Sequence, residues 1–233
     1  MRHSFSVVGT ALVLLTASSA FAQTPSAPPS QFTINVVQVI GSGCGSARDY
    51  AVSISPDKTA FTVGYANYAI YSGIDPDTGK AHKLQDNRKN CLIGVQVNAP
   101  NGITFGIAEA DMRGYMSLRP KANPMAITSF WFQGLAPTMP VSHVLRNSAV
   151  DFFGNPAVYP LGTDTDDFVN WQTTDLTGIA AIIYNPCGDQ RNLEINTQLQ
   201  TNADATEDES VIGADATDAS ITTVFHLAWA TCQ

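Results

Sequence analysis

The chain has 233 residues, 44% of them hydrophobic and 14% charged, with 12 Lys and Arg against 20 Asp and Glu. The formal net charge is −8 at pH 7, and no Lys or Arg follows Arg191. This acidic balance argues against a nucleic-acid-binding protein, which needs a basic face, and it disfavours binding to anionic membranes. The length suits one domain with a substantial hydrophobic core.

Residues 1–22 have the features of a secretory signal peptide. Arg2 gives a positive start, residues 5–16 form an apolar run, and Ala20 and Ala22 are the small residues before a cleavage site. The apolar run is shorter than the roughly 20 residues that span a bilayer, so no membrane insertion is expected after cleavage. The mature chain is therefore predicted to be secreted, either extracellular or periplasmic.

Residues 23–30, QTPSAPPS, read as a flexible tether, and residues 31–233 as a single domain. Within that domain strand-like segments follow one another between turn signals, and no window shows convincing helical spacing. These segments are residues 32–40, 50–55, 59–71, 91–100, 103–118, 125–135, 179–187, 191–200 and 221–232. The period-two alternation of the last two is the clearest. The pattern predicts an all-β fold, an antiparallel β-sandwich, with a jelly-roll arrangement as one form it could take.

The four cysteines could form disulfides, bind a metal or act as nucleophiles, and their spacing distinguishes these roles. Cys44, Cys91, Cys187 and Cys232 are an even set in an exported chain, which is typical of disulfides. Three pairings are open, and the order along the chain favours Cys44–Cys91 and Cys187–Cys232. No two cysteines are close enough in sequence for a zinc site, and no neighbouring base suggests a thiol nucleophile.

The segment EADMRGY contains the best candidate ligand-binding residues. On a strand, Glu109, Asp111 and Arg113 project from one face, because side chains alternate with a period of two. Two carboxylates and a guanidinium could orient a polar ligand or perform acid–base work. The favoured interpretation, however, is a solvated face on which Arg113 bridges its acidic neighbours as ion pairs.

Aromatic side chains are the signal for sugar binding, because pyranose rings stack on them. Trp171 follows acidic residues in a segment that reads as a loop, and it is the best candidate for an exposed aromatic, although a core position is the favoured interpretation for any single tryptophan. Trp131 and Trp229 are expected in the core.

No cofactor and no metal site are predicted, with calcium as the weak alternative. Asp75, Asp77 and Gly79 resemble half of a calcium loop, but the downstream Glu is missing, and a turn is the favoured interpretation. The acidic stretch of residues 204–218 is expected to be a solvated loop.

No residue is predicted to be catalytic. The sequence has no G-x-S-x-G elbow and no H-E-x-x-H motif, and His82, His143 and His226 are scattered. The favoured hypothesis is a secreted non-catalytic β-sandwich that binds a glycan or a protein at the cell surface or envelope. The alternative is a carbohydrate-active or other hydrolase that uses Glu109 or Asp111 with an acid near residues 164–167.

Several segments also resemble one known family. They are GSGCGS around Cys44, VSISPDKTAFTVGY, RKNCLIGVQVNAPNG around Cys91, DMRGYMSL, SFWFQG, NPCGDQRNLEINTQL around Cys187, and DATDASITTVFHLAWATC around Cys232. In order and spacing the chain is similar to the domain of unknown function 4360, a family of small secreted proteins of fungi and bacteria. Members often have proline after the first cysteine, where this chain has Gly45. The resemblance implies a secreted, disulfide-bearing β domain and no established activity.

Overall fold

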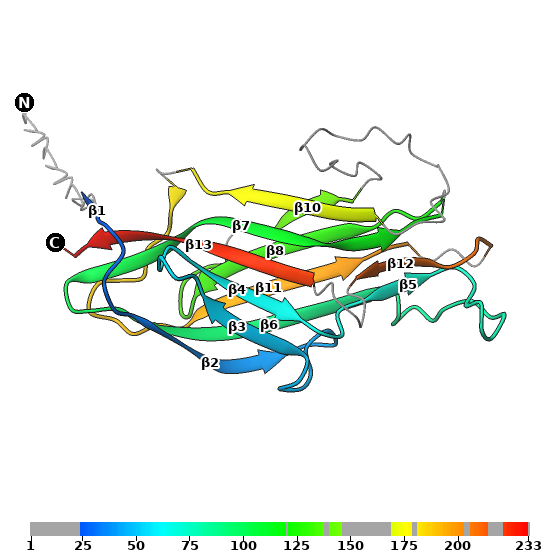
Figure 1. Ribbon diagram of the computed structural model, residues 1–233, viewed down its shortest axis with the longest axis horizontal. Helices are drawn as coiled ribbons and strands as arrows, with labels where there is room; N and C mark the ends of the chain where they lie inside the picture. Colours follow the sequence, from blue (N-terminus) through cyan, green and yellow to red (C-terminus); the bar gives the residue numbers. More distant parts are fainter. Residues whose placement is uncertain are drawn as a thin grey trace, which may run out of the picture.

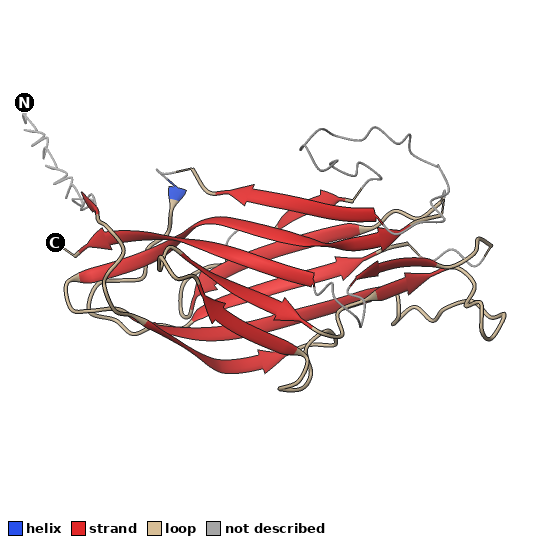
Figure 2. Ribbon diagram, in the orientation of Figure 1, coloured by secondary structure: helices blue, strands red, loops and turns tan. Residues whose placement is uncertain are grey.

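The computed structural model describes residues 24–119, 121–137, 140–145, 169–178, 181–202, 206–213 and 221–232. These residues form strands and loops with one short 3₁₀ turn at residue 181, drawn blue in Figure 2, and no α-helix, so the predicted all-β class is confirmed. Across the same ranges, no helix has the length and apolar character needed to cross a membrane. The predicted signal peptide lies outside the described residues.

One sheet has eight antiparallel strands around a long central strand, β7. Along the main path the order is β3-β4-β13-β7-β12-β5, while β1 pairs with β13 and β10 pairs with β7. The strands are β1 (Thr24–Pro25), β3 (Tyr50–Ile54), β4 (Ala60–Tyr65), β5 (Ile70–Ser72), β7 (Ile103–Ser117), β10 (Val169–Leu176), β12 (Ser210–Gly213) and β13 (Ile221–Thr231).

The second sheet has five antiparallel strands in the order β2-β6-β11-β8-β9. They are β2 (Thr33–Ile40), β6 (Arg88–Asn98), β11 (Leu193–Gln200), β8 (Met125–Phe132) and β9 (Val141–Val144). In Figure 1, β13 and β4 cross in front of β11 and β8, so the two sheets are layered as a sandwich.

Large apolar side chains from both sheets fill the space between them. Phe105 on β7 lies edge-on to Phe132 on β8, with ring centroids 5.3 Å apart, and also contacts Trp229 on β13. All three are at least 97% buried. A polar contact crosses the same layer, because the Thr197 hydroxyl on β11 donates to the Tyr65 hydroxyl on β4 at 3.3 Å. Each fully buried side chain of this size contributes on the order of 2 kcal/mol.

A β-bulge interrupts β7 at Ala108. His226 on β13 is paired with Glu109, but the next residue, Leu227, is paired with Ile107, so Ala108 is the extra residue. Its carbonyl accepts a hydrogen bond from the Thr177 backbone amide at 2.8 Å.

The bulge changes which residues of β7 face the core. Phe105 and Ile107 are buried before it, whereas Ala110 and Met112 are buried after it. The alternation therefore shifts by one residue, and Glu109, with every second residue after it, faces outward.

Both favoured disulfide pairings are confirmed. Cys44 bonds to Cys91 with Cα atoms 5.5 Å apart, and Cys187 bonds to Cys232 with Cα atoms 5.7 Å apart. The second bond joins the chain before β11 in one sheet to the end of β13 in the other. The glycine before Cys44 has a packing role, since a Cβ on Gly43 would lie 2.1 Å from the ring of Tyr68.

Several sequence predictions of local structure are wrong in detail. The expected strand 59–71 is two strands, β4 and β5, and the expected tether contains β1, which pairs with β13. The run 179–187 is not a buried strand, because Ile183 is 44% exposed and the described part makes only one isolated bridge, between Tyr184 and Gly106. The acidic stretch contains β12, which pairs with β5 and β7.

We predict that removing the Cys187–Cys232 bond by C187S/C232S lowers the free energy of unfolding by about 4 kcal/mol. The sequence separation is 45 residues, and opening a loop of that size adds about this much unfolded-state chain entropy. Urea unfolding of the oxidised proteins measures the change. An unchanged midpoint in the variant would contradict a stabilising role for this bond.

Candidate functional site

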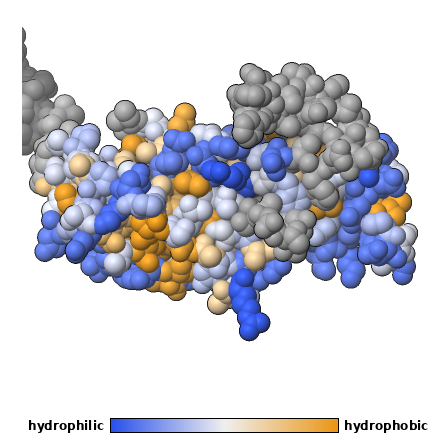
Figure 3. Space-filling view, viewed as in Figure 1, coloured by the Kyte–Doolittle hydropathy of each residue, from blue (hydrophilic) through white to orange (hydrophobic). Residues whose placement is uncertain are grey.

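The predicted site residues lie together on the outer side of three neighbouring strands, β13, β7 and β10. Glu109 is flanked by His226 and Leu176, Asp111 by Val224 and Thr174, and Arg113 by Thr222 and Gln172. We call these nine residues the polar face. The expectation that Glu109, Asp111 and Arg113 share one side of a strand is thus met, and β13 adds an imidazole that the sequence did not place there. Hydrophilic and intermediate residues cover most of this side of the molecule, with an apolar patch at its lower centre (Figure 3).

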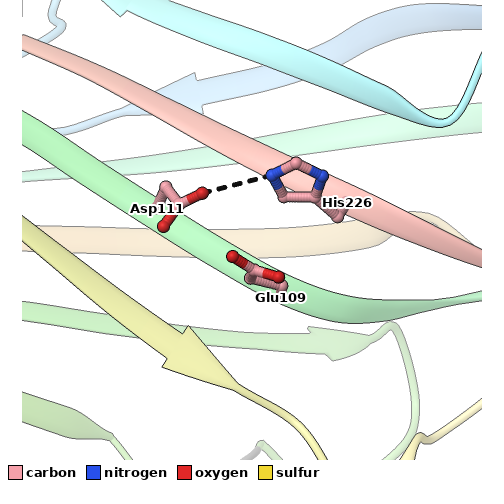
Figure 4. Close-up of side chains that lie close together, drawn as sticks. All are labelled: Glu109, Asp111 and His226. Atoms are coloured by element: carbon pink, nitrogen blue, oxygen red, sulfur yellow. Dashed lines mark hydrogen bonds and ion pairs between the residues drawn. The ribbon is translucent and has the colours of Figure 1, made fainter.

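Asp111 is held in position by its neighbours. The residue is 8% exposed, the Thr174 hydroxyl donates to its Oδ1, and the His226 Nε2 lies 3.2 Å from its Oδ2 (Figure 4). Burial raises the pKa of Asp111, but the hydrogen bonds from Thr174 and His226 outweigh it, so the pKa lies below the ordinary value of 3.8. Asp111 is therefore a fixed carboxylate at neutral pH.

Glu109 and Arg113 are open by comparison. Among the described residues neither side chain makes a hydrogen bond or ion pair, and Arg113 is exposed. The favoured interpretation, in which Arg113 bridges the acids as ion pairs, is therefore wrong among the described residues. Ligand atoms of Glu109, Asp111 and His226 lie within 4.8 Å of one another. Figure 4 shows these three side chains gathered on two neighbouring strands.

The three scattered histidines each meet a carboxylate that is distant in sequence. His82 Nε2 lies 2.6 Å from Glu209, and His226 pairs with Asp111 as described. His143 on β9 pairs with Asp175 on β10. This last pair links β9 of the five-stranded sheet to β10 of the eight-stranded sheet at the edge of the sandwich.

Trp171 is not the exposed loop aromatic for which it was the candidate, and the core position favoured for a single tryptophan is the one observed. Trp171 lies in β10 and is 4% exposed, and its indole Nε1 donates to the Tyr115 carbonyl at 3.1 Å. Alternation along β10 turns Trp171, Thr173 and Asp175 toward the other sheet, so the ring is part of the core. It offers no surface on which a sugar could stack.

Sequence analysis expected Trp131 in the core, but this tryptophan is partly exposed. Trp229 is buried as expected, but Trp131 is only partly buried and lies on the outer side of β8. Its neighbours in sequence, Phe130 and Phe132, pack in the core, and consecutive strand residues cannot all face the same way. The period-two rule applied to SFWFQG would have placed Trp131 outside, beside Glu194 of β11.

The segments considered for calcium form other contacts. The Asp75 carboxylate accepts hydrogen bonds from the backbone amides of Asp77 and Thr78, which confirms the turn. In the acidic stretch, Glu207 pairs with Lys121 at 2.6 Å. The acids near residues 164–167 lie outside the described residues.

The fold and site define a class, the disulfide-bonded, two-sheet β proteins that carry polar side chains on an open sheet face. The match of the model for the domain of unknown function DUF4360 to residues 30–232 shows that the chain belongs to that family. An uncharacterized secreted protein of Arthroderma benhamiae is 23% identical over 206 residues, which cover 88% of this chain and 74% of that protein.

Two solved structures show weak similarity. One is the enzymatically active domain of the bacteriophage CBA120 tailspike protein 4, with a TM-score of 0.23 and 9% identity over 87% of this chain and 20% of that chain. The other is TmCBM61 in complex with β-1,4-galactotriose, with a TM-score of 0.23 and 7% identity over 88% of this chain and 92% of that chain. The chain thus spans about a fifth of the tailspike chain. At these scores neither structure informs the fold or the site.

We predict that T174V lowers the free energy of unfolding by about 1 kcal/mol at pH 7, because it removes a hydrogen bond to the Asp111 carboxylate. The pKa of Asp111 is lowered in the folded state, so this contribution is present above 3.8 and is lost as the pH falls through the folded value. Urea unfolding at several pH values measures the difference.

The matched control is T222V, the same substitution on the polar face at a threonine without a hydrogen bond in the described structure. A T174V effect of the same size at pH 7 and at pH 2 would contradict the assignment.

Proposed function

We propose that this secreted protein is a non-catalytic glycan-binding protein and that the polar face is its binding surface. The observation that carries the proposal is the combination of an open carboxylate and an open guanidinium, on Glu109 and Arg113, beside the fixed carboxylate of Asp111. Sugar hydroxyls both donate and accept, so adjacent acceptor and donor groups complement them. Leu176, 76% exposed at the edge of the face, offers apolar contact for the C–H side of a sugar ring.

The placement of the carboxylates supports binding over hydrolysis. Glycosidases place two carboxyl groups on either side of the scissile bond. Glu109 and Asp111 project from the same side of one strand, and Asp111 is engaged by Thr174 and His226. A hollow of 380 Å³ at the sandwich edge is lined by residues of β8, β9 and β10, including His143 and Asp175, but not by Glu109 or Asp111.

The test is a glycan array with the oxidised mature protein, followed by calorimetry on the glycans that bind. We predict that R113A weakens binding about tenfold, the effect of one lost charge-assisted hydrogen bond. R48A is the matched control, because Arg48 is also exposed and its side chain has no partner among the described residues. Silence of the whole array, or equal effects of R113A and R48A, would overturn the proposal and favour a protein ligand.

A second candidate function is divalent-cation binding by Glu109, Asp111 and His226. The specific observation is that one imidazole nitrogen and two carboxylate oxygens come within 4.8 Å of one another. The imidazole favours a transition metal such as Zn²⁺ over Ca²⁺, which takes oxygen ligands. The hydrogen bond from Thr174 to Asp111 is the kind of outer contact that orients a metal-binding carboxylate.

If this candidate is correct, Zn²⁺ in excess raises the melting temperature of the wild-type protein and EDTA reverses the rise, because a ligand of the folded state stabilises it. H226Q should abolish the rise, whereas H82Q, which alters a histidine–carboxylate pair elsewhere, should retain it. An equal rise in wild type and H226Q would exclude this site.

A further inference from the structure

A row of four residues crosses the outer side of the five-stranded sheet, the side opposite to the polar face. In register across the strands lie Gln38 of β2, Gly94 of β6, Glu194 of β11 and Trp131 of β8. Leu193 and Ile195 are fully buried between the sheets, so alternation turns Glu194 away from the core. We call this row the Glu194 row.

Glu194 is a largely buried residue whose carboxylate has no partner among the described residues. It is 7% exposed, and within the described structure its side chain makes no hydrogen bond or ion pair. Burial raises its pKa above the ordinary value of 4.5. A buried charge is costly unless another group compensates it.

Gly94 provides the space in which this carboxylate lies. A Cβ at Gly94 would stand 3.0 and 3.2 Å from the two carboxylate oxygens and 3.2 Å from the Cβ of Gln38. The carboxylate of Glu194 therefore rests over the bare backbone of β6, with Trp131 at the next position on its other side.

The nearest cation along the chain is engaged elsewhere. Arg191 pairs with Asp189 at 3.0 Å and donates to the Gln133 carbonyl at 2.9 Å. The positive charge that would complement Glu194 must then come from outside the described structure. The net charge of −8 favours the approach of such a cation.

We propose that the Glu194 row binds a cationic amino sugar, with Glu194 paired to the ammonium group and Trp131 stacked on the pyranose ring. An ammonium group supplies hydrogen-bond donors and a positive charge to a carboxylate that has neither. The partly exposed indole of Trp131 attracts the same cation through its π face and packs against the C–H groups of the ring. Gln38 at the exposed end of the row provides an amide for a sugar hydroxyl.

The test compares three oligosaccharides of equal length by calorimetry at about pH 6, above the usual range of a carboxyl pKa. They are a glucosamine hexamer, an N-acetylglucosamine hexamer and a glucose hexamer. We expect the wild-type protein to bind the glucosamine hexamer at least tenfold more tightly than the other two, because only its amino groups are charged. Equal affinity for the three would overturn the proposal.

E194Q is the decisive variant and should weaken binding of the glucosamine hexamer about tenfold. Because burial raises the pKa of Glu194, the ionised carboxyl destabilises the folded state at neutral pH, and E194Q should melt at the same temperature or higher. If E194Q loses binding while its melting temperature is unchanged or higher, the loss is due to the missing carboxylate and not to unfolding. Retained binding in E194Q would exclude the proposal.

D77N is the matched control, because it removes one negative charge at an exposed carboxylate that belongs to neither the polar face nor the Glu194 row. If the cationic hexamer binds only through the overall negative charge, D77N and E194Q will weaken it equally, and the proposal fails. W131A should weaken binding while D77N does not. The polar face and the Glu194 row can thus fail separately, since R113A tests the former and E194Q the latter.

Discussion

The surface chemistry of the eight-stranded sheet depends on one extra residue in its central strand. Without the bulge at Ala108, the period of β7 that buries Phe105 and Ile107 would also turn Glu109, Asp111 and Arg113 toward the core. Three charged groups in an apolar layer would cost more than the layer could compensate. Because of the bulge, β7 packs apolar side chains in the core along its whole length. Its second half also carries Glu109, Asp111 and Arg113 on the outer side.

The two strands beside the bulge, β13 and β10, each place side chains next to the outward residues of β7. Because β13 continues its own alternation, His226 is directly opposite Glu109 and close to Asp111. On the other side, β10 contributes Thr174, whose hydroxyl fixes Asp111, and the backbone amide of Thr177, which satisfies the carbonyl of the extra residue. The polar face is thus built from groups that the sheet register brings together. The disulfide Cys187–Cys232 links the two sheets that hold these groups.

Much of this architecture could be predicted from the sequence, because it follows from local periodicity and compartment. The alternation of LEINTQLQ and ITTVFHLAW identified β11 and β13, and an even set of cysteines in a chain predicted to be exported identified the disulfides. The bulge also leaves a local trace, since apolar residues occupy 105 and 107 and then 110 and 112. A shift from odd to even positions within one strand is the pattern that a single inserted residue produces.

What could not be predicted depends on contacts between distant segments. Trp171 and Asp175 lie in a segment rich in acids and polar residues, so its sequence favoured a loop. In the structure both side chains face inward, where Asp175 meets His143 from the opposite sheet. No local pattern indicates that an inward acid will find a histidine on another strand. The same applies to His226 and Asp111, which are 115 residues apart.

The two candidate sites show how its surroundings distinguish a carboxylate that the fold compensates from one that it leaves without a partner. Asp111 and Glu194 are nearly equally buried, at 8% and 7% exposed, yet their pKa values move in opposite directions. Asp111 receives hydrogen bonds from Thr174 and His226, so the fold itself compensates the buried charge. Glu194 lies over the backbone of Gly94 and in register with Trp131, and among the described residues no hydrogen bond or ion pair compensates its negative charge. A ligand that adds a cation at Asp111 competes with groups already in place, whereas at Glu194 it supplies the interaction that the fold lacks. For this reason the uncompensated carboxylate is the stronger indication of a cationic ligand, although the charged cluster on β7 is the more conspicuous in the sequence.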